Sequence, residues 1–167
     1  MAPLIVLVAA TLLMRLVGQL GVMSLRTWQA STRAGLAVML CFTAVAHFND
    51  MRADLVRMVP PGVPNPELMV TLTGVCEVLG GIGLLVPRTR RVAAALLILF
   101  LVAVLPANIH AARAGLTLGD AAATPLWPRV ALQLLFIGLV WWSGWRRTGV
   151  TETPKTRTER DTVLGTS

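Results

Sequence analysis

One carboxylic acid, Glu77, stands in the middle of an apolar segment, residues 68–86. A soluble helix can turn such a side chain to water, but a helix that crosses a bilayer cannot. Insertion scales put the cost of a charged side chain there at roughly 2.5–3.5 kcal/mol unless it faces a partner or a wet cavity. Glu77 therefore predicts an integral membrane protein with a polar partner or a proton-exchanging site in its interior.

The first apolar segment supplies a candidate partner for Glu77. Thr11, Arg15 and Gln19 recur every fourth residue and so share one face of a helix. Counted from the ends of their segments, Arg15 and Glu77 both fall near the middle of the bilayer, so an ion pair is the simplest way to bury both charges. Three interpretations stay open. The ion pair only fixes helix register, or Glu77 has a substrate, proton or cofactor role, or the first helix is misplaced.

Three further polar side chains lie toward one end of their apolar segments: His47, Asn108 and Gln133. With Glu77 they could line one pocket open to the outer face, where imidazole and amide groups donate hydrogen bonds to a ligand oxygen. The alternative is structural. A histidine at a helix end often caps or anchors it, and amides join helices at ~0.6 kcal/mol each.

Other chemistry is disfavoured by what the chain contains. Two histidines on different helix faces, without a second carboxylate cluster, argue against a metal site. Cys41 and Cys76 do not share the polar faces of their segments, so we expect buried, inert thiols, not a redox pair. No phosphate-binding loop and no nucleophile–base motif is present.

Composition points to a lipid environment. Hydrophobic residues make up 55% of the chain and charged residues 14%, against about 25% charged in ordinary soluble domains. The net charge of +7 comes from residues between and after the apolar segments, not from one basic patch. We therefore expect a bilayer, and not nucleic acid, as the partner of this surface.

Five apolar segments approach the ~20 residues that a spanning helix needs. They predict an all-α fold, a polytopic membrane bundle over residues 1–147. A short surface helix is expected near residues 51–59, and the polar tail 148–167 is expected to be disordered. The predicted spans are residues 3–23, 34–51, 68–86, 92–112 and 130–145.

The charges between the predicted spans alternate. Connections rich in arginine and free of acids fall on one side, and connections with balanced charges fall on the other. By the positive-inside rule this pattern places the N-terminus outside and the C-terminus inside. The basic connections are 24–33, 87–91 and 146–147, and the balanced ones are 49–67 and 113–129.

An ordered set of short motifs resembles the DoxX-like family of small bacterial membrane proteins, over about residues 33–145. The resemblance implies a four-helix core in a bacterial plasma membrane, with the first span as an N-terminal addition. Its motifs contain the polar residues singled out above. They are Ala46-His47-Phe48, Met58-Val59-Pro60, Thr73 to Glu77 with Leu84 to Pro87, Pro106-Ala107-Asn108, and Leu132-Gln133.

The resemblance implies two functions of different classes. In the first, the chain is an accessory subunit of a membrane redox system that holds a quinone or a small sulfur compound in the outer-half pocket. His47 and Asn108 would donate hydrogen bonds to it, and Glu77 would exchange protons. In the second, the chain is a non-catalytic assembly factor or scaffold for another membrane protein. No intrinsic cofactor motif is present, which disfavours a complete enzyme, and five helices without an inverted repeat disfavour a transporter.

Overall fold

The computed structural model describes residues 2–117 and 124–145 of the 167-residue chain. This part is entirely helical and contains no strand, which confirms the expected helical bundle. The predicted tail, residues 148–167, lies outside the described residues. The elements are α1 (Ala2–Gln19), the 3-10 helix η1 (Met23–Leu25), α2 (Trp28–Val45), α3 (Arg52–Met58), α4 (Pro66–Leu85), α5 (Arg90–Arg113) and α6 (Leu126–Trp145).

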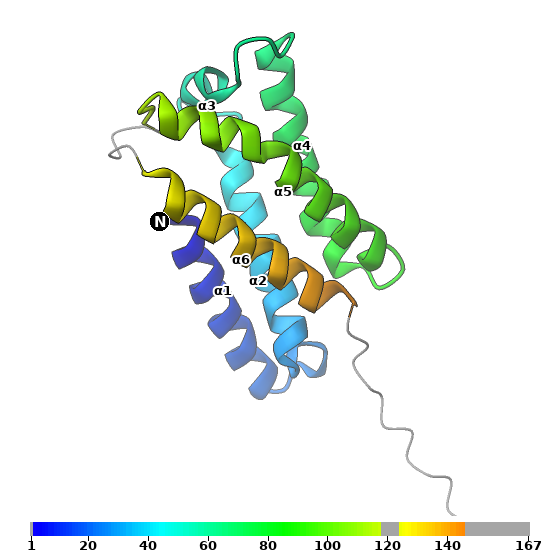
Figure 1. Cartoon of the computed structure of the whole chain (residues 1–167). Coiled ribbons are helices and arrows are strands. Elements are labelled where there is room, and N and C mark those ends of the chain that lie inside the picture. Colours follow the sequence, from blue (N-terminus) through cyan, green and yellow to red (C-terminus); the bar gives the residue numbers. More distant parts are fainter. Residues whose placement is uncertain (1, 118–123, 146–167) are drawn as a thin grey trace, which may run out of the picture.

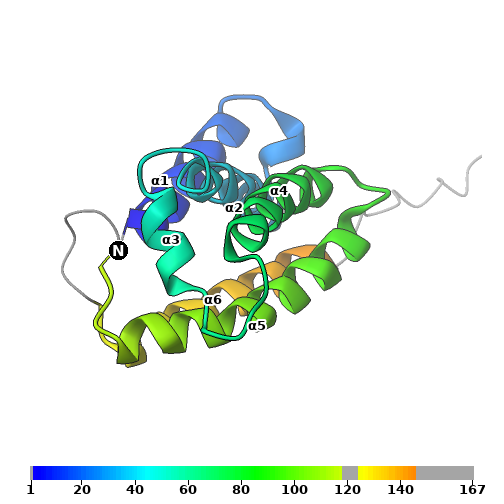
Figure 2. The same ribbon diagram turned by 90° about the horizontal axis from the view of Figure 1, so that it is seen from above.

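Helix α2 lies at the centre of the bundle. It packs against α1 on one side and α4 on the other, while α5 and α6 form a second layer that contacts α4 and α2 (Figures 1 and 2). The core lies where the two layers meet. Its most deeply buried large side chains are one each from α2, α4, α5 and α6: Leu36, Leu84, Leu97 and Val140.

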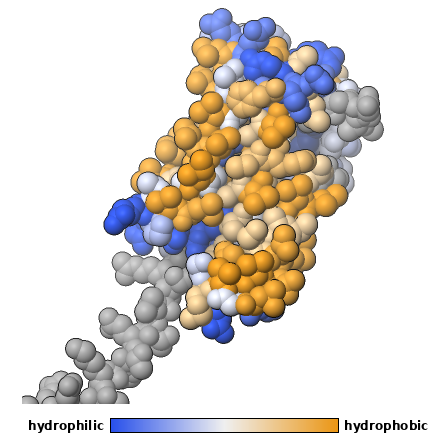
Figure 3. All heavy atoms as spheres, turned by 180° about the vertical axis from the view of Figure 1, so that it is seen from behind, coloured by the Kyte–Doolittle hydropathy of each residue, from blue (hydrophilic) through white to orange (hydrophobic). Residues whose placement is uncertain are grey.

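The outer surface of the bundle is apolar. Large hydrophobic side chains such as Leu79, Leu99 and Leu134 are more than half exposed, and hydrophobic residues cover the flank of the molecule between more hydrophilic ends (Figure 3). Soluble monomers rarely expose apolar surface on this scale. Four helices, α1, α4, α5 and α6, are long and apolar enough to cross a membrane. Together these features indicate a multi-pass membrane protein.

Helix α2 is not one of those four helices. Its first turns carry Gln29, Ser31, Thr32 and Arg33, which lower its hydropathy. It is nevertheless the most enclosed helix, because neighbouring helices cover most of its length. A helix that is shielded from lipid by protein can carry polar side chains that a lipid-facing helix cannot.

The first two helices differ from their predicted ranges. Helix α1 ends at Gln19, not at residue 23, because Gly21 adopts φ +127° and the Val22 amide donates to the Val17 carbonyl at 3.3 Å, a termination that glycine permits. Helix α2 covers Trp28–Val45, not residues 34–51. It begins early because the Thr27 hydroxyl caps it, accepting from the Ala30 amide at 3.2 Å. It also ends early, because the chain turns after Val45, where the Ala46 and His47 amides donate to the Thr43 and Ala44 carbonyls. The later helices lie close to the predicted ranges 68–86, 92–112 and 130–145.

The two ends of the bundle differ in charge. At one end, the α3 end, the short helix α3 packs against α4 and α5 (Figure 1). At the opposite end, the arginine end, lie the α1–α2 connection, the α4–α5 turn and the end of α6. Of the described residues, this end has several arginines and no carboxylate. Its arginines are Arg26, Arg33, Arg88, Arg90 and Arg91.

Candidate functional site

Small residues on α4 bring it close to α2. A Cβ built on Gly74 would lie 2.7 Å from the His47 Cβ, and one built on Gly81 would lie 3.3 Å from the Ala37 carbonyl oxygen. A larger side chain at residue 74 would push the histidine out of place, since real Cβ atoms do not approach so closely. Glycine here allows the turn after α2 to pack on α4 and aims His47 into the interface.

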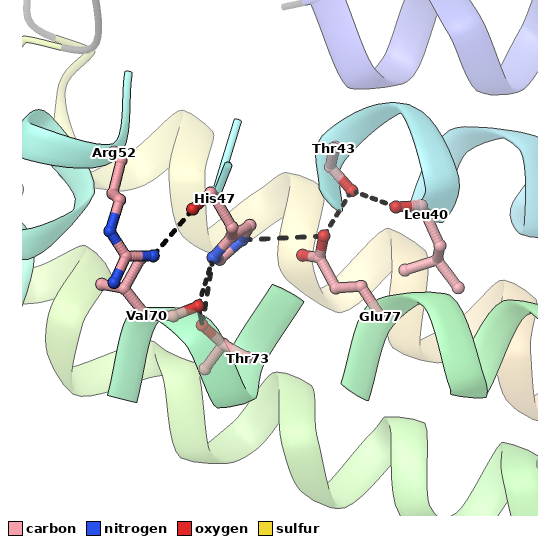
Figure 4. A network of polar contacts seen from close by, with 7 residues as sticks. All are labelled: Leu40, Thr43, His47, Arg52, Val70, Thr73 and Glu77. Carbon is pink, nitrogen blue, oxygen red and sulfur yellow. Dashed lines mark hydrogen bonds and ion pairs between the residues drawn. The ribbon is translucent and has the colours of Figure 1, made fainter. Parts of the chain in front are cut away.

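Glu77 of α4 faces two side chains, Thr43 of α2 and His47 of the turn that follows α2 (Figure 4). Its Oε2 is 2.9 Å from the Thr43 hydroxyl oxygen and 3.7 Å from Nε2 of His47. The first distance is a hydrogen bond, whereas the second is within ion-pair range and longer than a hydrogen bond. The His47 and Glu77 side chains are 11% and 14% exposed, so the pair is enclosed but not sealed.

The other ring nitrogen of His47 fixes the tautomer. Nδ1 lies 2.8 Å from the Val70 carbonyl oxygen, which can only accept, so Nδ1 carries a proton and donates it. The Thr73 hydroxyl, 3.2 Å from Nδ1, donates to the same carbonyl at 2.9 Å. Neutral His47 therefore has a bare Nε2 facing Glu77. A proton shared by these two groups sits either on the carboxyl group or on the ring.

Arg52 of α3 joins the turn that contains His47 to the start of α4. One guanidinium nitrogen donates to the His47 carbonyl at 2.9 Å, and the other donates to the Thr71 hydroxyl at 2.9 Å and the Glu67 carbonyl at 3.0 Å. These hydrogen bonds of the Arg52 guanidinium group link the turn after α2 to the first turns of α4. Sequence reasoning missed this role, because the charged residues of a short surface helix carry no spacing that distinguishes a capping arginine from a solvated one.

Asn108 and Gln133 form a second, separate contact. The Asn108 amide donates to the Gln133 side-chain oxygen at 3.4 Å, and the Gln133 amide donates to the Leu101 carbonyl. Leu101 precedes Val102, whose carbonyl loses its usual helical donor because Pro106 has no N–H. Gln133, which is buried, therefore joins α6 to α5 near the interruption that the proline makes.

The four predicted site residues thus come together in two pairs. His47 and Glu77 meet between α2 and α4, and Asn108 and Gln133 meet between α5 and α6. Within the described ranges, no hydrogen bond or ion pair links one pair to the other. The structure does not gather all four side chains into one polar cluster.

Comparison with known proteins places this site in a family. The family described as "Domain of unknown function (DUF8561)" matches residues 36–144. The chain belongs to this family. No curated protein and no solved structure matches the chain. The DUF8561 region contains His47, Glu77, Asn108 and Gln133, and leaves all of α1 outside.

Arg15 lies outside the DUF8561 region and apart from Glu77. Its guanidinium carbon is 5.1 Å from the centre of the Trp28 ring, a cation–π contact, and its Nε is buried without a partner. The predicted Arg15–Glu77 ion pair does not form. Because α1 ends at Gln19, Arg15 lies near the arginine end beside the start of α2, whereas Glu77 finds its partners at the far end of α2.

The two thiols also differ from expectation. Cys41 and Cys76 are free, but both are exposed, not buried, since they lie on faces of α2 and α4 that point away from the core. Among residues 2–117 and 124–145, no group of three or more His, Cys, Asp and Glu side chains could hold a metal ion. In the described part of the DUF8561 region, the titratable chemistry inside the bundle therefore centres on His47 and Glu77.

Proposed function

We propose that this chain is an accessory subunit of a membrane redox system, and that His47 and Glu77 bind and protonate a quinone or a small sulfur compound. One observation supports this most strongly. His47 Nε2 and Glu77 Oε2 face each other at 3.7 Å, and neither side chain is sealed from its surroundings. Titratable pairs inside apolar bundles are costly, which makes them candidates for proton transfer.

The hydrogen bonds around the pair support different roles for the two side chains: His47 donates to the ligand, and Glu77 supplies the proton. The Val70 carbonyl holds Nδ1 and orients the ring, which leaves Nε2 to act. When the shared proton is on Nε2, the ring can donate to a carbonyl-type oxygen of the ligand. The Thr43 hydroxyl, 2.9 Å from Oε2, then stabilises the Glu77 carboxylate that has given up the proton. Because Nδ1 keeps its own proton, the transferable proton is the one shared with Glu77.

The electrons must come from elsewhere. Reduction of a quinone to a quinol takes up two electrons and two protons, and the sequence carries no cofactor motif to supply the electrons. A membrane redox partner protein would donate them, and the His47–Glu77 pair would deliver protons that Glu77 regains from water at the α3 end. In this proposal the chain has no intrinsic cofactor, and the quinone is a bound substrate.

A non-catalytic assembly factor or scaffold is the second candidate. Asn108 and Gln133 favour it, because the Gln133 amide satisfies a backbone carbonyl and the two side chains bond to each other. Such bonds hold helices together without a free group for a ligand. In this candidate function the His47–Glu77 pair fixes the register of α2 on α4 and binds nothing.

The topology is part of the same proposal. We place α2 across the membrane as a fifth, protein-shielded span, so that α2–α6 form a DoxX-like core to which α1 is added. The arginine end then faces the cytoplasm by the positive-inside rule. This gives a bacterial plasma-membrane protein with the N-terminus outside and the C-terminus inside, and it places the His47–Glu77 pair nearer the outer face.

Ligand binding tests the proposal. The full chain is reconstituted in nanodiscs and titrated with a short-chain quinone analogue and, separately, with thiosulfate. We expect saturable binding of one of them that Glu77→Gln and His47→Leu weaken by about tenfold or more, which corresponds to ~1.4 kcal/mol. Gln133→Leu, at the second pair, serves as the matched control and should bind normally. No binding to either probe by the folded wild type would favour the scaffold.

A further inference from the structure

A second polar centre lies at the arginine end, far from His47 and Glu77. Arg33, in the second turn of α2, is only 6% exposed. One of its guanidinium nitrogens donates to the Ser143 carbonyl of α6 at 2.8 Å. A guanidinium has five N–H donors in a fixed fork, and a single backbone carbonyl satisfies one of them. Among residues 2–117 and 124–145, this buried positive charge therefore has no counter-charge.

Arg90, the first residue of α5, joins Arg33 at this point. The carbonyl oxygen of Arg90 lies 4.0 Å from the Cβ position of Gly144, the residue that follows Ser143. The Nε of Arg90 is buried without a hydrogen-bond partner. Helices α2, α5 and α6 thus bring Arg33 and Arg90 to the same short stretch of α6, Ser143–Gly144.

No acid of the described chain can neutralise them. Asp50, Asp54 and Glu67 lie at the α3 end, and Glu77 is engaged with Thr43 and His47. An enclosed Arg33 cation without an anion is costly, since removing a charge from water carries a penalty of several kcal/mol. An external anion at this place would supply a counter-charge to Arg33 and accept from the unused donors, among them the Arg90 Nε.

We propose that Arg33 and Arg90 form a binding site for a phosphate group between α2, α5 and α6. Guanidinium forks match phosphate oxygens in a bidentate manner, which suits two arginines that lie beside the same stretch of α6. In a membrane protein, the headgroup of an anionic phospholipid and free phosphate both offer this chemistry. Basic sites between spanning helices typically hold the former.

The experiment uses the purified full chain in maltoside micelles, which contain no phosphate. Phosphatidylglycerol, a diacylglycerol with the same acyl chains, and inorganic phosphate are added separately. The shift in melting temperature and the lipid retained in native mass spectrometry are measured. We expect phosphatidylglycerol to raise the melting temperature and to be retained, and the diacylglycerol to do neither.

Variants locate the site. Arg33→Gln and Arg90→Gln should each weaken phosphatidylglycerol binding by about tenfold, the loss of one charge-assisted contact. Arg88→Gln is the matched control, because Arg88 is an exposed arginine in the same turn. If Arg33→Gln does not fold, Arg90→Gln decides, since no hydrogen bond of the described chain rests on its Nε.

The remaining outcomes are also decisive. A rise in melting temperature with inorganic phosphate alone, lost in Arg90→Gln, supports the site and identifies free phosphate as its ligand. Equal stabilisation by the diacylglycerol would overturn the proposal, because acyl chains would then explain the effect. Undiminished phosphatidylglycerol binding by Arg90→Gln, or an equal loss in Arg88→Gln, would overturn it too.

Discussion

His47 and Glu77 meet through Nε2 and Oε2, 3.7 Å apart, while the Val70 carbonyl holds the opposite ring nitrogen of His47. The carbonyl fixes which nitrogen carries the permanent proton, so only the nitrogen that faces Glu77 can gain or lose one. This relationship joins an imidazole of the turn after α2 to a backbone carbonyl and a carboxyl group of α4.

The first prediction is that His47 and Glu77 are energetically coupled, whereas Arg15 and Glu77 are not. In a double-mutant cycle on the free energy of unfolding in detergent, His47→Leu and Glu77→Gln should be non-additive by about 0.5–3 kcal/mol. Arg15→Gln and Glu77→Gln should add, because Arg15 contacts Trp28. Coupling of Arg15 to Glu77 as large as that of His47 would contradict the assignment of partners.

The second prediction concerns the close approach of α4 to the turn after α2. Gly74→Ala places a Cβ 2.7 Å from that of His47, and overpacking of this kind typically destabilises a protein by about 1–3 kcal/mol. Gly138→Ala is the matched control, since nothing lies within 4 Å of its Cβ position, and it should be neutral or stabilising. The melting temperature of each variant in micelles provides the measurement, and equal effects at both sites would refute the packing argument.

The third prediction concerns the bond between α5 and α6. Gln133→Leu removes the hydrogen bonds that Gln133 makes to the Leu101 carbonyl and to the Asn108 amide. Its cost should be ~0.6 kcal/mol and no more than ~1.7 kcal/mol, as for other interhelical bonds in membranes. Gln19→Leu, at an exposed glutamine, is the control for the change in polarity. A thermal stability for Gln133→Leu at or above that of the control would remove the role assigned to this bond.

The fourth prediction is the topology. Reporter fusions after Arg26, Pro64, Arg88, Asp120 and Thr148 should report inside, outside, inside, outside and inside, because the proposed five-span topology places α2 across the membrane. The first fusion follows Arg26, which precedes α2, since Arg33 lies inside that helix. If the fusions after Arg26 and Pro64 report the same side, α2 does not cross and the five-span proposal fails.

Much of the fold could be predicted from the sequence because membrane helices are encoded by local hydropathy. The segment around Glu77 and the two that follow were located within a few residues. The ends of α1 and α2 were not, because Gly21 and the Thr27 cap act through backbone geometry that hydropathy does not register. That shift of a few residues moved Arg15 from the middle of the bundle toward its end.

The candidate site could be predicted only in part. Polarity marked His47, Glu77, Asn108 and Gln133, but their assignment to one pocket needed the rotation of each helix, which the sequence leaves open. The sequence placed Arg33 in a connection, although it is a buried residue of α2. Its contact with the Ser143 carbonyl joins residues 110 positions apart, and no local pattern encodes such a pairing.

The most direct test of the central claim is the nitrogen NMR spectrum of His47 in nanodiscs, with and without the quinone analogue or thiosulfate. We predict a protonated, hydrogen-bonded Nδ1 in all conditions, and an Nε2 resonance that shifts on saturation with the ligand. Glu77→Gln should abolish that shift while leaving Nδ1 unchanged. An Nε2 signal that neither ligand alters, or that responds equally in wild type and Glu77→Gln, would contradict a proton-exchanging His47–Glu77 site.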